Sequence, residues 1–375
     1  MTLTIREIEP NRKNFYAPAF DIVVDGSSLV RALHLEIVSV EVEQVLGTAH
    51  RFSFVINNGF DLSRRDFIKV NGKTLPDFFE LGTEVRVSMG YGDRDKLDLM
   101  LTGIVTEWST NFSASSIPQI TISGYDHLYP LTKGTASGSW QDRKDSEVVS
   151  IVANDYKLTP KVDDTGTKYP KVVQSQESGV QFINRLANRN AFEFFVREKE
   201  LYFRAPANDQ SGAVELFWGR GLVSFAPEIK LSDQVTAVEV YGWDVQNKKT
   251  FVGKAKQGDE PGRDRARPSG TPRKSGAERL EKVSGKDPGT LRVRRSVFSQ
   301  QEADAVAKAI LARRAEGFVG GRGESIGIPD IKPNANITLR GLGDLFSTTL
   351  YIQRATHTVN SSGYRTTFEI KDTTI

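Results

Sequence analysis

The sequence predicts a mainly β protein, in which two similar antiparallel β-barrel-like domains have a small α+β domain between them. Three observations support this fold class. Alternation of apolar and polar residues dominates both ends of the chain, helical spacing appears in the middle, and the length allows several cores. The chain has 375 residues, with 38% hydrophobic residues that include 21 Phe. At about 100–200 residues per domain, this length predicts two or three domains.

Composition excludes several classes of protein. The chain has no Cys, which excludes a disulfide scaffold, a thiolate metal site and a cysteine nucleophile. Its net charge of +3 is mild, whereas nucleic-acid binders usually gather basic residues on one face. The first ten residues lack the basic start and apolar core of a signal peptide, and no apolar run approaches the ~18–20 residues of a membrane span. We therefore expect synthesis in a cytoplasm and no membrane insertion.

Residues 1–136 are interpreted as the first β-barrel-like domain. Between 83 and 91, Val85, Val87 and Met89 lie on one predicted face, and Glu84 and Arg86 lie on the other. Further strands are expected at 34–43, where a change of parity suits a bulge, and at 98–108 and 118–125.

Residues 137–215 are interpreted as the α+β domain. Apolar residues recur at helical spacing in 145–156 and 178–189, with Asp145 and Ser178 as N-cap candidates. A Phe-rich segment, 192–203, follows and predicts two short strands.

Residues 216–375 are interpreted as the second β-barrel-like domain. Strands are expected at 235–243, 336–340, 349–359 and 363–371. A helix is expected at 300–316, where Ser299 and Glu302 form a capping box. Residues 253–290 are rich in Pro, Gly and mixed charge, and we expect a mobile loop there.

The two β-domains align with each other. The aligned segments are 85–87 with 337–339, 101–106 with 351–356, 119–126 with 365–372, and 40–42 with 238–240. Such a match reflects either a true internal repeat or the general resemblance of alternating strands. If the repeat is true, a trimer would place six similar domains around one axis.

Several segments carry a resemblance to a known family. They are the C-terminal runs 323–329, 331–343, 356–358 and 363–369, and the middle helix 182–187 with the hairpin that ends at 201–203. Together they resemble the late-control gene D family of contractile phage tails, which shares its fold with the hub part of type VI secretion spike proteins. The resemblance covers most of the chain and is weakest at 1–30 and 253–290.

This resemblance implies a structural role as the central baseplate hub of a phage tail or a phage-derived contractile injection system. It implies a homotrimer whose six β-domains form a ring that joins a hexameric inner tube to a trimeric spike. Type VI spikes continue into a needle, whereas this chain ends after the second β-domain, so the spike is expected to be a separate protein. Other baseplate proteins are further expected partners, and no cofactor and no specific nucleic acid are expected. A cell-wall-degrading tail enzyme and a nucleic-acid-binding regulator remain the alternatives.

Three short motifs imitate chemical sites but lack the required context. Gly323 to Gly327 matches the G-x-S-x-G nucleophile elbow around Ser325, yet no strand–turn–helix pattern surrounds it. Lys73 follows Gly72 as in a phosphate loop, but position 67 is Phe where that motif needs Gly. Asp93 and Asp95 resemble the start of a calcium loop without its later Gly and Glu. We predict no catalytic site.

The remaining ionisable residues also favour structural roles. The four histidines, His34, His50, His127 and His357, have no helical i,i+3 or i,i+4 spacing, so no metal site is predicted. The neighbours Asp163 and Asp164 lie in a predicted turn, where a catalytic carboxylate pair is not expected. Basic residues gather within 253–290, namely Arg263, Arg265, Arg267, Arg273 and Lys274. They are interspersed with acidic residues and lack aromatic partners for bases, which favours a solvated insertion over a nucleic-acid contact.

Overall fold

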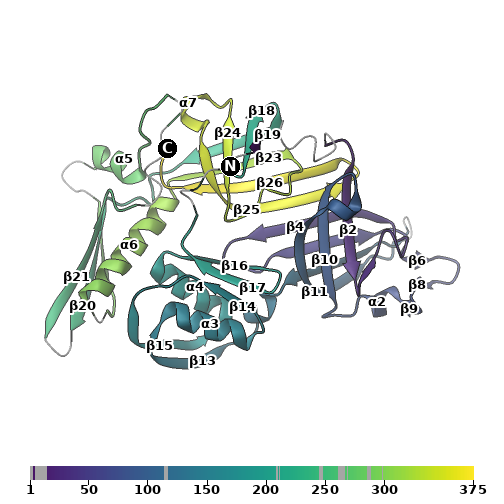
Figure 1. Cartoon of the computed structure of the whole chain (residues 1–375), viewed down its shortest axis with the longest axis horizontal. Coiled ribbons are helices and arrows are strands. Elements are labelled where there is room, and N and C mark those ends of the chain that lie inside the picture. Colours follow the sequence, from purple (N-terminus) through teal and green to yellow (C-terminus); the bar gives the residue numbers. More distant parts are fainter. Residues whose placement is uncertain are drawn as a thin grey trace.

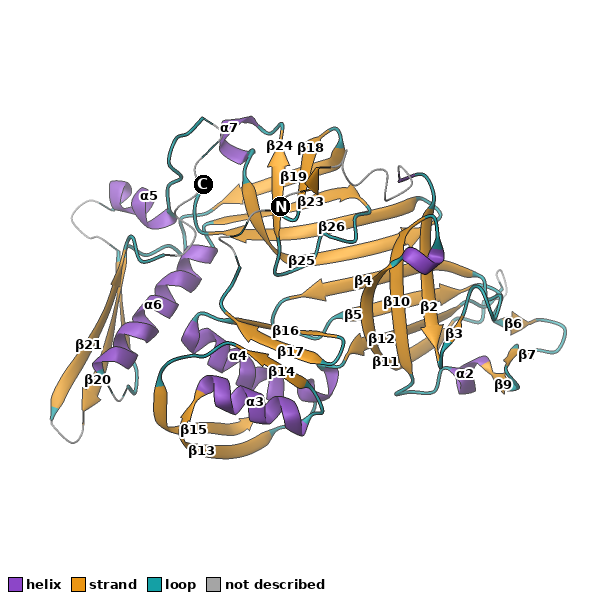
Figure 2. Ribbon diagram, in the orientation of Figure 1, coloured by secondary structure: helices purple, strands orange, loops and turns teal. Residues whose placement is uncertain are grey.

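The computed structural model describes residues 3–4, 15–113, 117–207, 210, 212–244, 248–260, 267, 269–284, 289–297 and 299–375 (Figure 1). The fold is mainly β with a few helices, which confirms the predicted fold class. Figure 2 shows a long curved sheet that runs across the molecule, with two smaller lobes beside it.

The first barrel forms one end of this sheet. Its strands pair in the order β3-β2-β10-β11-β12-β5-β4. Alternate residues of β10, Val85, Val87 and Met89, are fully buried in its core, as their spacing predicts. The strands are β2 (Pro18–Val24), β3 (Ser27–Ser28), β4 (Ile37–Val45), β5 (Arg51–Ile56), β10 (Glu84–Tyr91), β11 (Asp98–Thr110) and β12 (Ile120–Asp126).

Short elements decorate the first barrel. They are β6 (Phe60–Asp61), β7 (Asp66–Phe67), β8 (Lys69–Val70), β9 (Lys73–Thr74), α2 (Leu75–Phe78) and the 3₁₀ turn η2 (Arg94–Lys96). The 3₁₀ turn η3 (Tyr129–Thr132) belongs to the α+β lobe, where Leu131 is part of the core. The strand β1 (Leu3–Thr4) pairs with the second barrel instead.

The second barrel is closed. Its strands pair in the cycle β18-β19-β23-β26-β25-β24-β18. They enclose a separate core that includes Leu339, Ile352, Phe368 and Ile370. The elements are β18 (Val214–Trp218), β19 (Gly221–Ile229), β23 (Val319–Ile326), β24 (Asn336–Arg340), α7 (Gly343–Phe346), β25 (Thr349–Asn360) and β26 (Gly363–Asp372).

One strand pair joins the two barrels. Residues 40–45 of β4 pair antiparallel with residues 354–359 of β25, so that a 14-stranded sheet in the described part of the chain serves both barrels. Side chains reinforce this joint. Val359 and Tyr364 pack into the first core, and the Tyr91 hydroxyl donates to the carbonyl oxygen of Gly327 at 2.9 Å.

The α+β lobe has its own core and lies under the joint (Figure 1). Its helices are α3 (Asp145–Asp155) and α4 (Gly179–Asn190), and its strands are β13 (Ala136–Lys144), β14 (Thr159–Val162), β15 (Lys168–Glu177), β16 (Glu193–Arg197) and β17 (Glu200–Arg204). Ser178 caps α4 as expected, because its hydroxyl accepts from the Gln181 amide at 3.2 Å.

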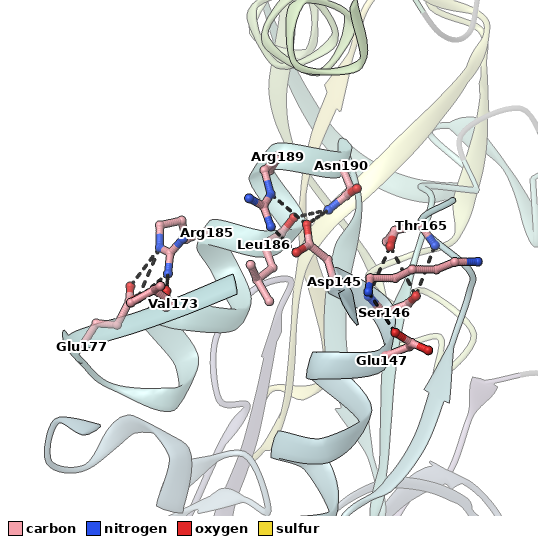
Figure 3. Close-up of polar contacts among 11 residues, drawn as sticks. Asp145, Ser146, Glu147, Thr165, Val173, Glu177, Arg185, Leu186, Arg189 and Asn190 are labelled. Atoms are coloured by element: carbon pink, nitrogen blue, oxygen red, sulfur yellow. Dashed lines mark hydrogen bonds and ion pairs between the residues drawn. The ribbon is translucent and has the colours of Figure 1, made fainter. Parts of the chain in front are cut away.

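Asp145 is not the N-cap that its position predicts. The helix α3 already begins at Asp145, and the N-cap residue is Lys144. The buried Asp145 carboxylate instead accepts hydrogen bonds from Arg189 Nε at 2.8 Å and Asn190 Nδ2 at 2.7 Å (Figure 3). It therefore ties the start of α3 to the end of α4, a contact that local spacing does not reveal.

A fourth core lies inside the interval 216–375, which the sequence predicts to be one domain. Strands β20 (Ala237–Asp244), β21 (Lys249–Lys256) and β22 (Thr290–Arg294) form a separate sheet, and α6 (Gln300–Glu316) packs on it. The lobe is inserted between β19 and β23. The strand expected at 235–243 is therefore β20 of this lobe rather than part of the second barrel.

Part of the segment 253–290 has regular structure, contrary to expectation. β21 extends to Lys256, and Ser275 caps the helix α5 (Gly276–Val283). The backbone of Lys274 exchanges hydrogen bonds of 2.9 and 3.0 Å with Ile375. Composition does not predict this arrangement, because the residue that pairs with the segment, Ile375, is distant in the sequence. Residues 261–266, 268 and 285–288, with Arg263 and Arg265, lie outside the described residues, and the mobility of the segment remains a prediction.

Candidate assembly surface

The internal repeat is visible in the strand pairing. The first barrel contains the run β4-β5-β12-β11-β10, and the second contains β19-β23-β26-β25-β24 in the same chain order and with the same antiparallel neighbours. Bulges fall at corresponding points, between β4 and β5 as between β19 and β23, and between β11 and β12 as between β25 and β26. The resemblance ends at the next strand, because β2 is antiparallel to β10 whereas β18 is parallel to β24.

These bulges correct two segments of the sequence alignment. The bulge in β11 places Glu107 at the position of Arg354, whereas the alignment of 101–106 with 351–356 put Ile104 there, three residues out of register. The match of 40–42 with 238–240 is also wrong, because the repeat of β4 is β19. The other two aligned segments agree with the pairing, and Ile122 corresponds to Phe368.

The joint between the barrels shows what these strand edges do when they are paired. Along β25, Ala355, His357 and Val359 are buried against β4, where Val40 and Val42 are also buried. The intervening residues carry polar contacts, including an ion pair between Arg354 and Glu43. The joint is thus a two-stranded antiparallel contact with one buried face, which contains Gln44 and His357 besides the apolar residues, and one more exposed polar face.

The strand β19, which is the repeat of β4, and the strand β11, which is the repeat of β25, lack such a partner strand among the described residues. β19 pairs with β18 only at Gly221 and Leu222, so its outer edge from Ser224 to Ile229 is open. In β11, the ladder with β10 ends at Ile104, and the stretch from Glu107 onward pairs on one side with β12. An open edge with free backbone groups is a template for another strand.

Large apolar side chains are exposed along these open edges. Trp108 and Phe112 of the first barrel are 39% and 61% exposed, whereas their repeats, Ala355 and Val359, are 0% and 5% exposed. On β19, Ile229 is 38% exposed. Large exposed apolar side chains on an unpaired strand edge are typical of interaction surfaces. We define the assembly surface as two edges: the β11 edge, residues 107–112, and the β19 edge, residues 224–230.

An aromatic cluster holds the β11 edge in place. Phe60 and Phe67 face each other across the β6–β7 hairpin with ring centroids 5.3 Å apart. Phe112 lies 5.3 Å from Phe60, and Trp108 lies 6.3 Å from Phe67, both in edge-to-face geometry. Such contacts orient the two side chains while leaving much of their surface in solvent.

The motifs that imitate chemical sites have structural roles. Ser325 is fully buried in β23, and its hydroxyl donates to the carbonyl oxygen of Ile326 at 2.8 Å. Lys73 follows the turn of the β8–β9 hairpin, where Gly72 has a φ of 81°. Asp93 caps the turn η2, where its carboxylate accepts from the Asp95 amide at 3.1 Å. None of the three positions has the geometry that its motif requires.

The histidines are dispersed over the molecule. His34 has a φ of 51° in a turn, and His127 lies 3.6 Å from Glu84. His357 is buried between the Tyr364 hydroxyl and the Ile331 carbonyl oxygen, each at 2.9 Å, and burial lowers its pKa to about 3. Within the described ranges, no group of three or more His, Asp or Glu side chains could hold a metal ion.

A buried pair of ionisable groups lies where β12 leads into the α+β lobe. His50 Nδ1 is 3.5 Å from Asp126 Oδ2. Burial lowers the pKa of His50 to about 4 and raises the pKa of Asp126 to about 7, so it favours the neutral form of each group. The Asp126 carboxylate also accepts from the Leu128 amide at 3.0 Å, which fixes the start of the lobe.

One residue of the acidic pair and one of the basic segment have defined partners in the described part of the chain. Asp164 forms an ion pair with Lys144 at 2.8 Å, and this contact lowers the pKa of Asp164 below its usual value. Arg273 is completely buried, 3.2 Å from Asp372, and is not available to an external acidic partner. None of the helices described is both long and apolar enough to cross a membrane.

Comparison with solved structures identifies the class of fold. The chain is similar to the 43 kDa tail protein of prophage MuSo2 from Shewanella oneidensis, with 12% identity, a TM-score of 0.68, and coverage of 94% of this chain and 98% of that chain. It is similar to a tail protein from Neisseria meningitidis, with 13% identity, a TM-score of 0.66, and coverage of 95% and 97%. An E. coli component of the type VI secretion system is a third similar structure, with 12% identity, a TM-score of 0.53, and coverage of 94% and 76%. The fold is therefore that of phage tail proteins and of this secretion component, as the resemblance implied.

The chain belongs to the Alg8 N-terminal domain family, whose sequence profile matches residues 16–361. No curated protein matches the chain by sequence. The narrower assignment to the late-control gene D family remains a prediction.

Proposed function

We propose that this protein is the central hub subunit of the baseplate in a contractile phage tail or a phage-derived injection particle. In this role it has a structural function and no catalytic one. Three copies form a ring. Each copy contributes two barrels, so the ring contains six similar units around one axis.

One observation carries the proposal: the two barrels of a single chain repeat the same strand pairing and are joined edge to edge through β4 and β25. A contact of this kind is heterologous, because each barrel uses a different edge toward its neighbour. Heterologous contacts between similar units generate closed rings when the rotation between units is right. The tail-protein fold supports the same conclusion.

Such a ring solves a problem of symmetry. A hexameric tube needs six similar contacts, and six barrels supply them, whereas a trimeric spike needs three identical contacts, and three chains supply them. The α+β lobe and the inserted lobe of β20, β21, β22 and α6 occur once in each chain and are thus suited to threefold contacts. The expected partners are the inner tube ring, a separate trimeric spike and other baseplate proteins, with the assembled tail as the final location.

The test is the mass and symmetry of the purified full chain. Native mass spectrometry should give three chains per particle, and class averages from negative-stain microscopy should show a ring with six density maxima. A chain that stays monomeric at high concentration, both alone and with a spike protein from the same particle, would disprove the homotrimer. Addition of inner tube protein should yield a complex with six tube subunits for every three hub chains.

A further inference from the structure

We infer that copies of this chain associate by pairing the β19 edge of one copy with the β11 edge of the next, in the register that β4 and β25 use within the chain. This inference rests on the proposed ring of copies and adds the strands and residues that close it. Its basis is that β19 is the repeat of β4 and that residues 107–112 are the repeat of residues 354–359.

The register follows from transferring the observed pairs onto their repeats. Within the chain, Val45 pairs with Arg354, Gln44 with Ala355, and Val40 with Val359. The bulges fix the equivalences. The pairs expected between copies are Lys230 with Glu107, Ile229 with Trp108, Glu228 with Ser109, Pro227 with Thr110, Ala226 with Asn111, and Phe225 with Phe112.

The chemistry of these pairs is complementary, although the register was taken only from the pairs of β4 with β25 within the chain. Two of the exposed apolar side chains, Trp108 and Ile229, come to lie directly opposite each other on one face. Phe112 meets Phe225, which is partly buried against the second core. On the other face, Lys230, which already contacts Glu228 at 2.8 Å, lies opposite Glu107. Cross-strand pairs of both kinds stabilise sheets.

The burial pattern at the joint shows the expected result of such a contact. Ala355 and Val359 lie in a strand that is paired with β4, and they are buried in the second and the first core, respectively. Trp108 and Phe112 occupy the same positions in a strand that has no such partner in the single chain, and both are exposed. The two open edges belong to different barrels (Figure 2). The β11 edge of one copy can therefore pair with the β19 edge of a second copy.

Pro227 is compatible with this pairing and limits it. The Lys230 amide donates to the Phe318 carbonyl oxygen at 2.9 Å, toward the β23 side, so the alternate residues Ile229 and Pro227 face the open edge. Pro227 has no N–H, so the new ladder contains one hydrogen bond fewer than the ladder of β4 with β25. Proline on an edge strand also discourages pairing with unrelated strands.

Disulfide trapping tests the register directly, because the native chain has no Cys. Ser109 and Glu228 would form a pair without mutual hydrogen bonds, in which Cα atoms are about 4.5 Å apart and side chains are close. Full-length S109C and E228C chains, each singly substituted, are mixed and oxidised, and the covalent dimer is measured. The matched control is S109C mixed with I229C, which shifts the pair by one residue and places the thiols on opposite faces of the sheet.

A covalent dimer should form with S109C and E228C and not with the control mixture or with either chain alone. The variant W108E should weaken association about 30-fold or more, as expected for loss of a central aromatic contact. Its thermal stability should fall only slightly compared with the loss of association, because Trp108 is 39% exposed and its ring contact within the chain is the one with Phe67. The control is W243E, since Trp243 is exposed on β20, away from both edges, and association should be unaffected.

The outcomes separate this inference from the proposed function. Trimers that give no S109C–E228C dimer, or that give the shifted dimer instead, would overturn the inference and leave the hub proposal intact. Specific trapping in assemblies that do not contain three chains would support the inference and overturn the homotrimer. A chain that remains monomeric throughout would overturn both.

Discussion

The two barrels share a run of five antiparallel strands but differ in how their longest strands are covered. In β25, the apolar residues beyond the bulge are buried against β4, whereas in β11 the corresponding Trp108 and Phe112 are exposed. The difference does not lie in strand pattern, since both strands alternate in the same way. It lies in whether the same chain supplies a strand that pairs with the open edge. For β25 the chain supplies β4, whereas for residues 107–112 of β11 we expect a second copy to supply that strand.

The barrel cores repeat in volume rather than in residue type. In the first barrel, Phe54 pairs with Ile122, and in the second barrel the same two positions hold Gly323 and Phe368. The phenylalanine is on β5 in the first barrel, whereas in the second barrel it is on β26, the equivalent of β12. A Cβ atom on Gly323 would lie 2.3 Å from Cζ of Phe368, so this glycine is needed for the large ring opposite it. Repeats that conserve total volume in this way align poorly by sequence.

The largest expected effect comes from removing the ring that fills this space. Phe368→Ala should lower the free energy of unfolding of the second barrel by about 3–5 kcal/mol, through lost transfer energy and a cavity beside Gly323. Ile122→Ala should have a similar but somewhat smaller effect on the first barrel. Denaturant unfolding measures both, with Lys371→Ala as the exposed control on the same strand, expected to change stability by less than about 0.5 kcal/mol. Unchanged stability in Phe368→Ala would mean that the equivalence of the two cores is wrong.

Sequence reasoning identifies the fold class because alternation marks the buried face of a strand. It found the strands around Val87 and Phe368 and the helix α6 after its Ser299 cap. Alternation says nothing about which edge meets which, so it did not predict the joint of β4 with β25, whose partners are over 300 residues apart. For the same reason β20, which alternates like any strand, was assigned to the wrong sheet.

The assembly surface was also missed by sequence reasoning, and for a physical reason. Trp108 and Phe112 are aromatic residues at the end of an alternating strand, a pattern that by itself indicates core. Their exposure follows from the absence of a covering strand, which is a property of the tertiary structure. The available signal was the internal repeat, because it compares two strands that differ in covering.

A second comparison concerns the aspartates that end the equivalent strands β12 and β26. Asp126 is buried beside His50, and Asp372 is buried beside the guanidinium of Arg273. Arg273→Ala should lower the free energy of unfolding by about 3–5 kcal/mol, because a buried carboxylate loses its cation. Limited proteolysis should then cut the backbone near Lys274, which is protected in the wild-type chain by its hydrogen bonds to Ile375. Equal protease resistance in variant and wild type would contradict this account of the segment.

Asp126 should respond to pH instead. Its pKa is raised from 3.8 to about 7, so the folded state retains a proton that the unfolded state has lost. Stability from this group is fully present below about pH 4 and is lost as the pH rises to about 7, at up to ~1.4 kcal/mol per pH unit. Asp126→Asn removes this loss while keeping an oxygen acceptor for the Leu128 amide. Relative to wild type, the variant should therefore gain stability between pH 4.5 and pH 7, measured by denaturant midpoints. A constant difference across that range would show that Asp126 titrates normally.

The smallest expected effect tests the polar face of the two open edges. In the inferred register, Glu107 of one copy lies opposite Lys230 of the next, and a cross-strand ion pair contributes about 0.2–1 kcal/mol. Glu107→Lys and Lys230→Glu should each weaken association a few-fold by placing like charges together, and the double variant should recover most of the loss. Sedimentation equilibrium at low salt measures all four chains, because salt screens exposed pairs. Within the first barrel, Glu107 lies on an exposed stretch, so the thermal stability of the monomer should not change. The double variant distinguishes direct contact from a general effect of charge. Additive losses of affinity would place these two residues apart and reject the register. Recovery of affinity would show that the barrels of neighbouring copies meet as β4 and β25 do within one chain.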